Sequence, residues 1–144
     1  MIDKFGRKIT YLRLSVTDRC NFRCTYCMSE NVEFLPKKDL LTLEELETIC
    51  SVFIDKGITK IRISGGEPLV RKNIIQLFQK LGKKLNTSNL NELTLTTNGS
   101  QLKEYSSYLY DSGVRRVNIS LAILDEKKFH LITKKITSSQ FLKE

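Results

Sequence analysis

The sequence has few of the features that mark membrane, secreted or disulfide-rich proteins. No apolar run approaches the roughly 20 residues that a membrane-spanning helix requires. The first ten residues lack the apolar stretch and the small-residue cleavage site of a signal peptide. With only 4 cysteines in 144 residues, a disulfide-dense mini-protein is excluded. The 40% of hydrophobic residues is enough for one domain to bury a core. We expect a cytoplasmic globular protein.

The chain also lacks a long basic block, although it is strongly basic. Lys and Arg number 24 against 16 Asp and Glu, which gives a net charge of +8. A positive balance favours an anionic partner, but the basic residues are dispersed along the chain. The pattern therefore indicates a phosphate-bearing small ligand, with neither nucleic acid nor a membrane as partner. A lysine-rich surface that only keeps the protein soluble explains the charge equally well.

Strand-like and helix-like segments alternate along the chain. Alternation of apolar and polar residues predicts strands at 10–17, 58–64, 92–97 and 114–121. Apolar residues at helical spacing predict helices at 43–56, 73–81, 102–112 and 126–135. Thr42 and Glu45 have the spacing of a capping box, Asp125 is a helix cap, and Asn98-Gly99 is a turn dipeptide. Gly57 and Gly113 are placed to end their helices, and residues 83–91 are expected to form a polar surface loop.

This alternation predicts an α/β fold with a parallel sheet and right-handed crossovers. Four strands are too few to close a barrel. In such sheets the chemistry lies at the carboxyl ends of the strands. The segments to consider are therefore 18–28, 65–68, 98–99 and 121–124.

Three cysteines, Cys20, Cys24 and Cys27, directly follow the first predicted strand. Their spacing lets one loop wrap three thiolates around a single metal centre. A disulfide would leave one thiol unpaired, and a structural zinc site would need Cys50 or His130 as a fourth ligand. Cys50 lies on the apolar face of its helix, which favours core burial, and His130 is expected on a helix flank. Three thiolates without a fourth suggest a 4Fe-4S cluster in which one iron is open to an outside molecule.

Two motifs together resemble the radical S-adenosylmethionine (SAM) superfamily. They are the CxxxCxxC spacing with Tyr26 before the third cysteine, and Gly65-Gly66-Glu67-Pro68 after the second strand. The segments ITYLRLSVTDRCNFRCTYCM, KIRISGGEPLVRK, LTLTTNG and GVRRVNISL are further similar to the GTP 3′,8-cyclase family of molybdenum cofactor biosynthesis. This likeness covers roughly residues 2–133.

The resemblance implies the N-terminal half of a partial (β/α) TIM-like barrel with about four βα units. On this basis residues 1–144 are expected to form a truncated radical SAM core domain, without the C-terminal barrel half and without a second-cluster region. Three features depart from the family pattern. Ser29 replaces the usual Pro, Ala122 replaces the usual Asp, and the sequence beyond Thr133 diverges.

The resemblance also implies cofactors and their contacts. A 4Fe-4S cluster would be held by Cys20, Cys24 and Cys27, with SAM on its open iron. SAM contacts would come from Tyr26, Gly66, Glu67 and Ser120, and GTP contacts from Arg13, Arg62 and Thr96. No catalytic residue is implied beyond the cluster and SAM, because the cofactor carries the hard chemistry. Without the resemblance, the arginines would be taken as ordinary exposed strand positions.

The partners that the resemblance implies are GTP as substrate and a reduced flavodoxin-type or other electron donor, and it is compatible with a homodimer. Two other interpretations remain open on the sequence. One is a radical SAM enzyme with another substrate, because both motifs are shared across the superfamily. The other is an inactive metal-binding fragment that holds zinc or a cluster without turnover.

Overall fold

A computed structural model describes residues 1–28, 32–120 and 125–134. Its elements, in chain order, are β1 (Tyr11–Ser15), η1 (Lys37–Asp39), α1 (Leu43–Asp55), β2 (Lys60–Ser64), η2 (Pro68–Val70), α2 (Ile74–Gly82), β3 (Glu92–Thr97), α3 (Leu102–Asp111), β4 (Arg116–Ile119) and α4 (Glu126–Thr133). The predicted alternation of strands and helices is confirmed.

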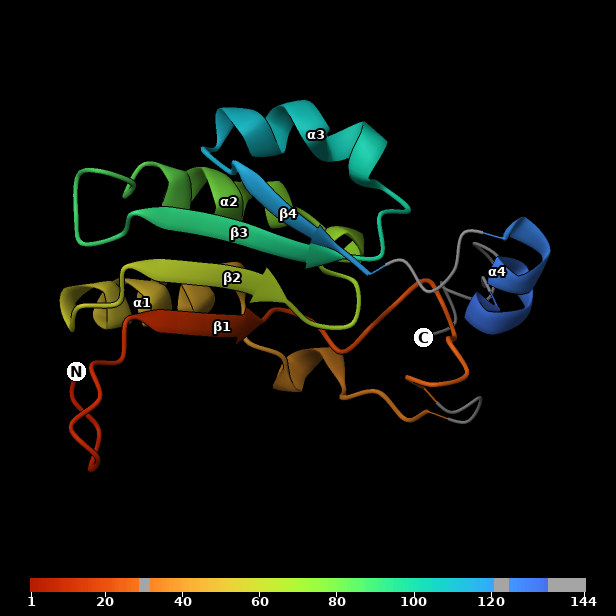
Figure 1. Cartoon of the computed structure of the whole chain (residues 1–144), viewed down its shortest axis with the longest axis horizontal. Coiled ribbons are helices and arrows are strands. Elements are labelled where there is room, and N and C mark those ends of the chain that lie inside the picture. The colour runs from red at the N-terminus through yellow and green to blue at the C-terminus, as the bar shows by residue number, and fades with distance from the viewer. Residues whose placement is uncertain (29–31, 121–124, 135–144) are drawn as a thin grey trace.

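The four strands form one parallel sheet in the order β1-β2-β3-β4. All four run the same way in Figure 1, and α4 lies beyond their carboxyl ends. Neighbouring strands are consecutive in the chain, so each crossover helix returns the chain to the next position in the sheet. This order, with one helix after each strand, is that of successive units of a (β/α) barrel, as expected.

Helix α1 begins at the capping box that the sequence predicts. The Thr42 hydroxyl accepts a hydrogen bond from the backbone N–H of Glu45 at 3.2 Å, and the Glu45 carboxylate accepts one from the backbone N–H of Thr42 at 2.7 Å. Asp125 caps α4 in a similar way, since its carboxylate accepts from the backbone N–H of Lys128 at 2.9 Å. Each reciprocal or single cap satisfies helix N–H groups that would otherwise have no partner.

The predicted strands at 58–64 and 114–121 begin too early, and the reason is the same in both. Gly57 has φ +94°, and the next residue, Ile58, donates its N–H back to the carbonyl of Phe53 at 3.0 Å. Val114 follows Gly113 and donates to Leu109 at 3.0 Å. Both residues therefore belong to Schellman helix ends, where a buried apolar side chain follows the glycine. As apolar residues they look like the first residue of a strand, but their backbone N–H groups still bond to the last turn of the preceding helix.

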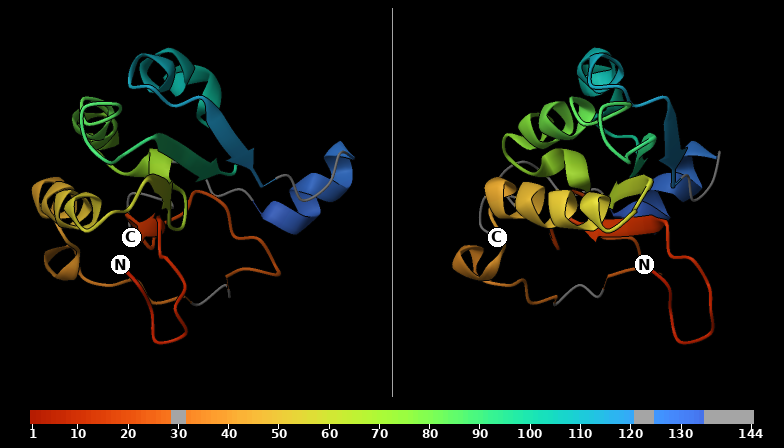
Figure 2. Two further views of the ribbon diagram at one scale, coloured as in Figure 1. Left: turned by 60° about the vertical axis from the view of Figure 1, so that its left-hand side comes forward. Right: turned by 90° about the vertical axis from the view of Figure 1, so that its left-hand side faces the viewer.

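One face of the sheet is packed against α1, α2 and α3. Figure 2 shows the three helices on the same side. The buried strand residues on this face are Leu14, Ile61, Ile63, Leu93 and Leu95, and they pack on Leu46, Cys50, Ile54, Leu77, Phe78 and Leu81 of the helices. Cys50 is fully buried, which confirms its interpretation as a core residue. Burying each large apolar side chain contributes about 1.5–3 kcal/mol.

The opposite face of the sheet is polar, and we call it the open face. Its residues alternate with the core residues along the strands. They are Tyr11, Arg13 and Ser15 of β1, Lys60, Arg62 and Ser64 of β2, Glu92, Thr94 and Thr96 of β3, and Arg116 and Asn118 of β4. The strand register places Arg13 beside Arg62, Arg62 beside Thr94, and Thr94 beside Arg116. A row rich in guanidinium groups therefore crosses the open face.

The loop at 83–91 is less polar than predicted. Leu90 is fully buried and Leu85 packs against the core. The Asn89 side chain donates to the carbonyl of Ile54 at 3.0 Å. The loop therefore covers the amino end of the core between α1 and β3. Because most of its residues are polar, the sequence does not indicate this packing.

Among the described ranges, no helix is long and apolar enough to cross a membrane.

Candidate functional site

The three clustered cysteines follow β1 in an irregular loop that contains one helical turn. The carbonyl of Cys24 accepts hydrogen bonds from the backbone N–H groups of Cys27 at 2.9 Å and Met28 at 3.0 Å. Residues three apart in such a turn lie on the same side, so Cys24 and Cys27 face a common space. Cys20 and Cys24 are half-buried and Cys27 is exposed.

Contacts with a buried arginine and with α4 hold this loop. The Arg23 guanidinium donates to the carbonyls of Cys20 at 2.7 Å and Phe22 at 3.0 Å. The backbone N–H of Arg23 donates to Thr133 at 2.8 Å, at the end of α4. The Phe22 ring meets Phe129 of α4 edge to face, with centroids 5.8 Å apart. Hydrogen bonds inside the loop, from Arg23, and contacts with α4 therefore both hold the segment that carries the thiols.

The Cys20 sulfur accepts two N–H hydrogen bonds. The donors are the backbone of Phe22 at 3.4 Å and the side-chain amide of Asn98 at 3.7 Å. Burial raises the pKa of the Cys20 thiol, and the negative charge of Glu67 adds to the rise, while the two hydrogen bonds oppose it. The donors thus favour the charged form of a sulfur that its surroundings otherwise keep neutral.

Tyr26 stands among the three thiols, although its side chain is 66% exposed. Desolvation raises the pKa of its phenol, and a hydrogen bond to Cys24 adds to the rise. The charges of all three cysteines act on it in the same direction. The Tyr26 phenol therefore lies near all three cysteine side chains.

The donor set of this loop fits a cluster held by three thiolates. Within the described ranges, no three His, Cys, Asp or Glu side chains are already gathered at metal-binding geometry. The loop nevertheless supplies three thiols from eight consecutive residues and N–H donors to one sulfur, which are features of Fe–S ligation. Cys50 takes no part, since burial in α1 raises its pKa to about 12. The side chain of His130 lies outside the described part.

The Gly65-Gly66-Glu67-Pro68 segment lies directly against the chain that leads into Cys20. The backbone N–H of Gly66 donates to Thr17 and that of Glu67 donates to Arg19, both at 2.8 Å. A Cβ on Gly66 would lie 2.2 Å from the carbonyl oxygen of Arg19. Only glycine allows this approach. The two motifs found in the sequence are therefore joined through their backbones.

Glu67 is fully buried, and its carboxylate accepts three hydrogen bonds. The donors are the N–H of Leu69 at 3.0 Å, the hydroxyl of Thr97 at 2.7 Å and the N–H of Asn98 at 2.6 Å. A buried carboxylate is stable only when it is so satisfied. Glu67 thus ties the glycine-rich segment to the carboxyl end of β3, and its carboxylate is already hydrogen-bonded to groups of the protein itself.

A cavity of about 470 Å³ opens at the carboxyl end of the open face. It brings together three residues predicted for three different roles: Arg13, Cys27 and Gly66. The remaining lining residues are Ser15, Thr17, Asp18, Met28, Ser64 and Gly65. Nearness at the carboxyl edge is what the topology predicts, because parallel strands end on the same side of the sheet.

Arg13 lines this cavity, whereas Arg62 and Thr96 lie elsewhere on the same face of the sheet. The Arg13 guanidinium donates through Nε to the hydroxyl of Ser64 at 3.1 Å. Arg62 lies over the ring of Tyr11 at 5.6 Å, and its Nε is buried without a hydrogen-bond partner among the described residues. Thr96 is opposite Asn118 on β4. An arginine with an unused buried donor on a polar sheet face is suited to receive an anionic ligand.

Ser120 follows β4, where its N–H donates to the carbonyl of Thr97 at 2.8 Å. It is exposed at the carboxyl edge of the sheet. The two family departures at Ser29 and Ala122 lie outside the described residues, as does the divergent sequence after Lys134.

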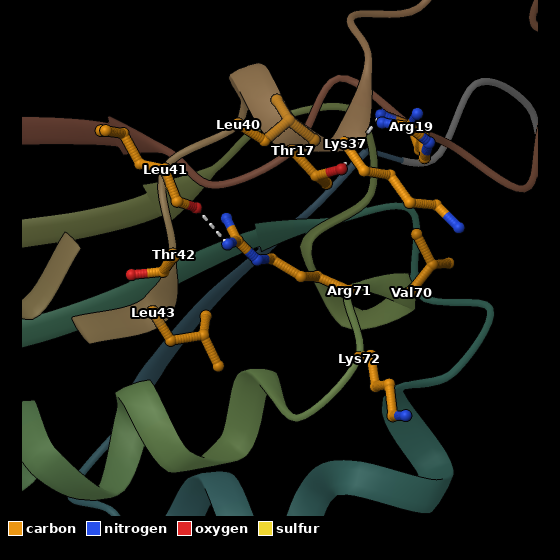
Figure 3. Close-up of a pocket in the computed structure, with 10 residues that line it drawn as sticks. All are labelled: Thr17, Arg19, Lys37, Leu40, Leu41, Thr42, Leu43, Val70, Arg71 and Lys72. Carbon is orange, nitrogen blue, oxygen red and sulfur yellow. Dashed lines mark hydrogen bonds between the residues drawn. The ribbon is translucent and has the colours of Figure 1, made fainter. Parts of the chain in front are cut away.

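A second cavity, of about 430 Å³, lies between the start of α1 and the segment after η2, and the sequence did not indicate it. Figure 3 shows the Arg71 side chain reaching across it toward Leu41. The Arg71 guanidinium donates to the carbonyls of Val16 and Leu41. Arg71 therefore braces the end of β1 against the entry to α1, and Thr17 separates this cavity from the first.

Sequence reasoning missed the residues that connect the two motifs. Asn98 was predicted as part of a turn and of the strand-end segment 98–99, without a contact to a cysteine, and Thr97 only as a strand residue. The parallel sheet brings these segments to one edge, as predicted, but their individual hydrogen bonds to Cys20 and Glu67 depend on side-chain geometry that no local pattern reveals. Asp18 and Arg19 brace the loop that leads into Cys20. Their ion pair is 3.0 Å long, and Asp18 also accepts from the N–H of Leu35 at 2.7 Å.

Comparison with known sequences agrees with this geometry. The chain is 67% identical over 134 residues to a GTP 3′,8-cyclase of Rhizobium etli, 64% identical to that of Agrobacterium fabrum and 63% identical to that of Brucella ovis. Each match covers 93% of this chain and 38–39% of the relative. The chain therefore spans less than two-fifths of the length of these relatives.

Two solved structures share the fold. SuiB of Streptococcus suis, solved with its precursor peptide SuiA, matches with a TM-score of 0.66 and 21% identity over 91% of this chain and 28% of that one. BtrN, solved in complex with AdoMet and 2-DOIA, matches with a TM-score of 0.58 and 18% identity over 95% of this chain and 55% of that one. The sequence model of the radical SAM superfamily matches residues 14–143. From its motifs, its fold and this match, the chain belongs to the radical SAM superfamily.

Proposed function

We propose that these residues form the first barrel half of a GTP 3′,8-cyclase, a radical SAM lyase that converts GTP to a 3′,8-cyclised nucleotide in molybdenum cofactor biosynthesis. The observation that carries the proposal is the cavity at the carboxyl edge, where Cys27, Gly66 and Arg13 line one space. The 67% identity to a relative of that name supports the choice of substrate.

In this proposal Cys20, Cys24 and Cys27 hold a 4Fe-4S cluster, and SAM completes its coordination. When bound, the cluster supplies the electron that cleaves SAM to methionine and a 5′-deoxyadenosyl radical, and a reduced external carrier replaces that electron. The chain's own role is to present three thiols from a braced loop and to keep the ligand in place beside them. Positioning of this kind lowers a barrier without any acid–base residue.

The SAM molecule would lie along the edge formed by Gly66 and the cysteine loop. Because Gly66 has no side chain, the Arg19 carbonyl lies directly against it, and this contact places the glycine-rich segment beside the cysteine loop. Tyr26 stands beside the sulfurs, and Ser120 lies at the same edge beyond Thr97. Glu67 would act by fixing the backbone of this segment, since its carboxylate is already engaged.

GTP would bind on the open face next to that edge. Arg13 and Arg62 offer guanidinium groups in register on β1 and β2, and Thr96 offers a hydroxyl one row closer to the carboxyl end. Charge-assisted, often bidentate hydrogen bonds from arginine suit a triphosphate. Phosphates held there would leave the ribose near the cavity, beside the proposed SAM edge.

The proposal can be tested on the chain reconstituted with iron and sulfide under anaerobic conditions. We expect about four irons per chain and broad absorbance near roughly 400 nm. With a reductant and SAM, we expect GTP to increase the yield of 5′-deoxyadenosine and a cyclised nucleotide to appear by mass spectrometry. Cys24→Ala serves as the matched control, because it should assemble no cluster and cleave no SAM.

Two outcomes would point to the alternatives. Cleavage of SAM at a rate that GTP does not change, with no cyclised nucleotide, would favour a radical SAM enzyme with another substrate. A colourless protein that holds one zinc tightly would favour a metal-binding fragment. Retention of iron by the Cys24→Ala variant would contradict the ligand assignment itself.

A further inference from the structure

Asn98 is the residue through which the end of β3 touches the cysteine loop. Its side-chain amide donates one hydrogen bond to the Cys20 sulfur at 3.7 Å and another to the Asn21 side-chain oxygen at 2.9 Å. The Asn21 amide in turn donates to the Ser100 hydroxyl at 2.9 Å. The asparagine therefore contacts a predicted cluster ligand directly, from a strand that is distant in the sequence.

Two further hydrogen bonds fix the position of Asn98. Its backbone N–H donates to the buried Glu67 carboxylate at 2.6 Å, and its side-chain oxygen accepts from the N–H of Ser100 at 2.9 Å. The bond from Ser100 belongs to the turn that Asn98-Gly99 predicts, and the bond to Glu67 ties that turn to the glycine-rich segment. The NH₂ group is not required by the turn, and it is the group aimed at Cys20 and Asn21.

We propose that Asn98 is a positioning residue that raises the reduction potential of the cluster by donating a hydrogen bond to the Cys20 sulfur. The inference rests on the proposed function, since it takes Cys20 as a cluster ligand. One-electron reduction adds negative charge that is shared by the ligand sulfurs. A donor at one of them stabilises the reduced form more than the oxidised form, and hydrogen bonds to sulfur are among the factors that set these potentials.

The same contacts include one of the three hydrogen bonds that satisfy the buried Glu67 carboxylate. Its carboxylate joins the segment that holds Gly66 to the N–H of Asn98, and Asn98 joins that N–H to Cys20. The proposed SAM edge and the cluster sulfur are thus two ends of one short hydrogen-bond chain. Glu67 keeps Asn98 at the distance at which its amide reaches the sulfur, since each link is buried or half-buried.

Two substitutions separate the donor from the turn. Asn98→Asp keeps an oxygen that accepts from Ser100 but replaces the NH₂ donor, whereas Asn98→Ala removes the whole side chain. Asn91→Asp is the matched control, because it makes the same chemical change at an exposed site just before β3, at the far end of the strand. The reconstituted chain and each variant would be titrated against redox mediators, with the reduced cluster followed by electron paramagnetic resonance and iron measured in parallel.

We expect both Asn98 variants to bind as much iron as the parent and to titrate at a more negative potential. Asn98→Asp should shift further than Asn98→Ala, because it adds a negative charge, and Asn91→Asp should titrate with the parent. Unchanged potentials in both Asn98 variants would overturn the inference and leave the proposed function intact. Loss of the cluster in both would also overturn it, because Asn98 would then serve assembly. A parent chain that binds no cluster would overturn the proposed function and this inference together.

Discussion

The two faces of the sheet use neighbouring residues for opposite purposes. On β2, Ile63 is fully buried under the helices, while Arg62 before it lies on the open face with a buried donor that no described residue uses. On β1, Leu14 is in the core and Arg13 lines the cavity. The period of two along a strand thus separates the residues that stabilise the fold from those available to a ligand.

Stability and binding should therefore be affected by different substitutions. Apolar residues on the covered face contribute in proportion to the surface they bury. The open face contributes little to the core, and its basic side chains are only partly balanced by Glu92, which pairs with Lys60 and Arg116. Adjacent positions on one strand therefore provide matched pairs for testing the account.

The largest effect on stability is expected on the covered face. Ile63→Ala should lower the free energy of unfolding by about 2–5 kcal/mol, because it removes buried atoms and leaves a cavity. Urea unfolding followed by circular dichroism measures this change. The control is Ser15→Ala on the open face, which should stay within about 0.5 kcal/mol of the parent. An equal loss in the two variants would contradict the division between the faces.

The next effect is expected in ligand binding. Arg62→Ala should weaken GTP binding by about 10- to 100-fold, since a hydrogen bond to a charged group contributes about 1.5–3 kcal/mol. Isothermal titration calorimetry on the parent and the variant measures the change. Arg115→Ala is the control, because that guanidinium stacks on Tyr110 at 3.8 Å and has no assigned role at the site. If Arg62→Ala lost stability but bound GTP normally, the open face would be structural.

A smaller effect is expected at the start of α1, on the covered side. Thr42→Ala should lower the free energy of unfolding by about 1 kcal/mol, because the N–H of Glu45 loses its capping oxygen. Thr48→Ala removes the same hydroxyl from the exposed middle of the helix and should cost nothing, since alanine has the higher helix propensity. Urea midpoints compare the two. GTP affinity should be the same in both variants.

The smallest effect is expected from the ion pairs of the open face. A hydrogen bond from Lys60 lowers the pKa of Glu92 below its ordinary value of 4.5, and Arg116 acts in the same direction. The pKa of Glu92 is therefore lower in the folded state than in the unfolded state. The stability that its ion pairs contribute is fully present above the unfolded-state pKa, and it is lost as the pH falls through the folded-state pKa.

Because Glu92 is half-exposed, we expect its ion pairs to contribute less than about 1 kcal/mol to the free energy of unfolding. Urea unfolding of the parent and Glu92→Gln between about pH 6 and pH 3 measures it. The two proteins should converge in stability at the acid end. A difference that grows as the pH falls would contradict the sign.

Much of the fold could be predicted because its signals are local. The capping box at Thr42 and Glu45 lies within four residues, and the turn at Asn98-Gly99 within two. The strand starts at Ile58 and Val114 were predicted wrongly, because an apolar residue after a glycine looks the same in a strand and in a Schellman helix end.

The candidate site divides in a similar way. Cys27, Gly66 and Arg13 could be expected near one another, since each follows or lies on a parallel strand whose carboxyl end faces the same edge. The link from Glu67 through Asn98 to Cys20 could not be expected. It depends on separations of 2.6 Å and 3.7 Å between segments about thirty and eighty positions apart.

The central claim is that three cysteines hold a cluster whose remaining iron binds SAM directly. The most direct test is electron–nuclear double resonance on the reduced, reconstituted chain, with SAM carrying ¹⁵N at its methionine amino group. The account predicts a nitrogen coupling large enough to require an iron–nitrogen bond, and its loss when unlabelled SAM is used. A cluster signal that SAM leaves unchanged, with no ¹⁵N coupling at saturating SAM, would contradict it.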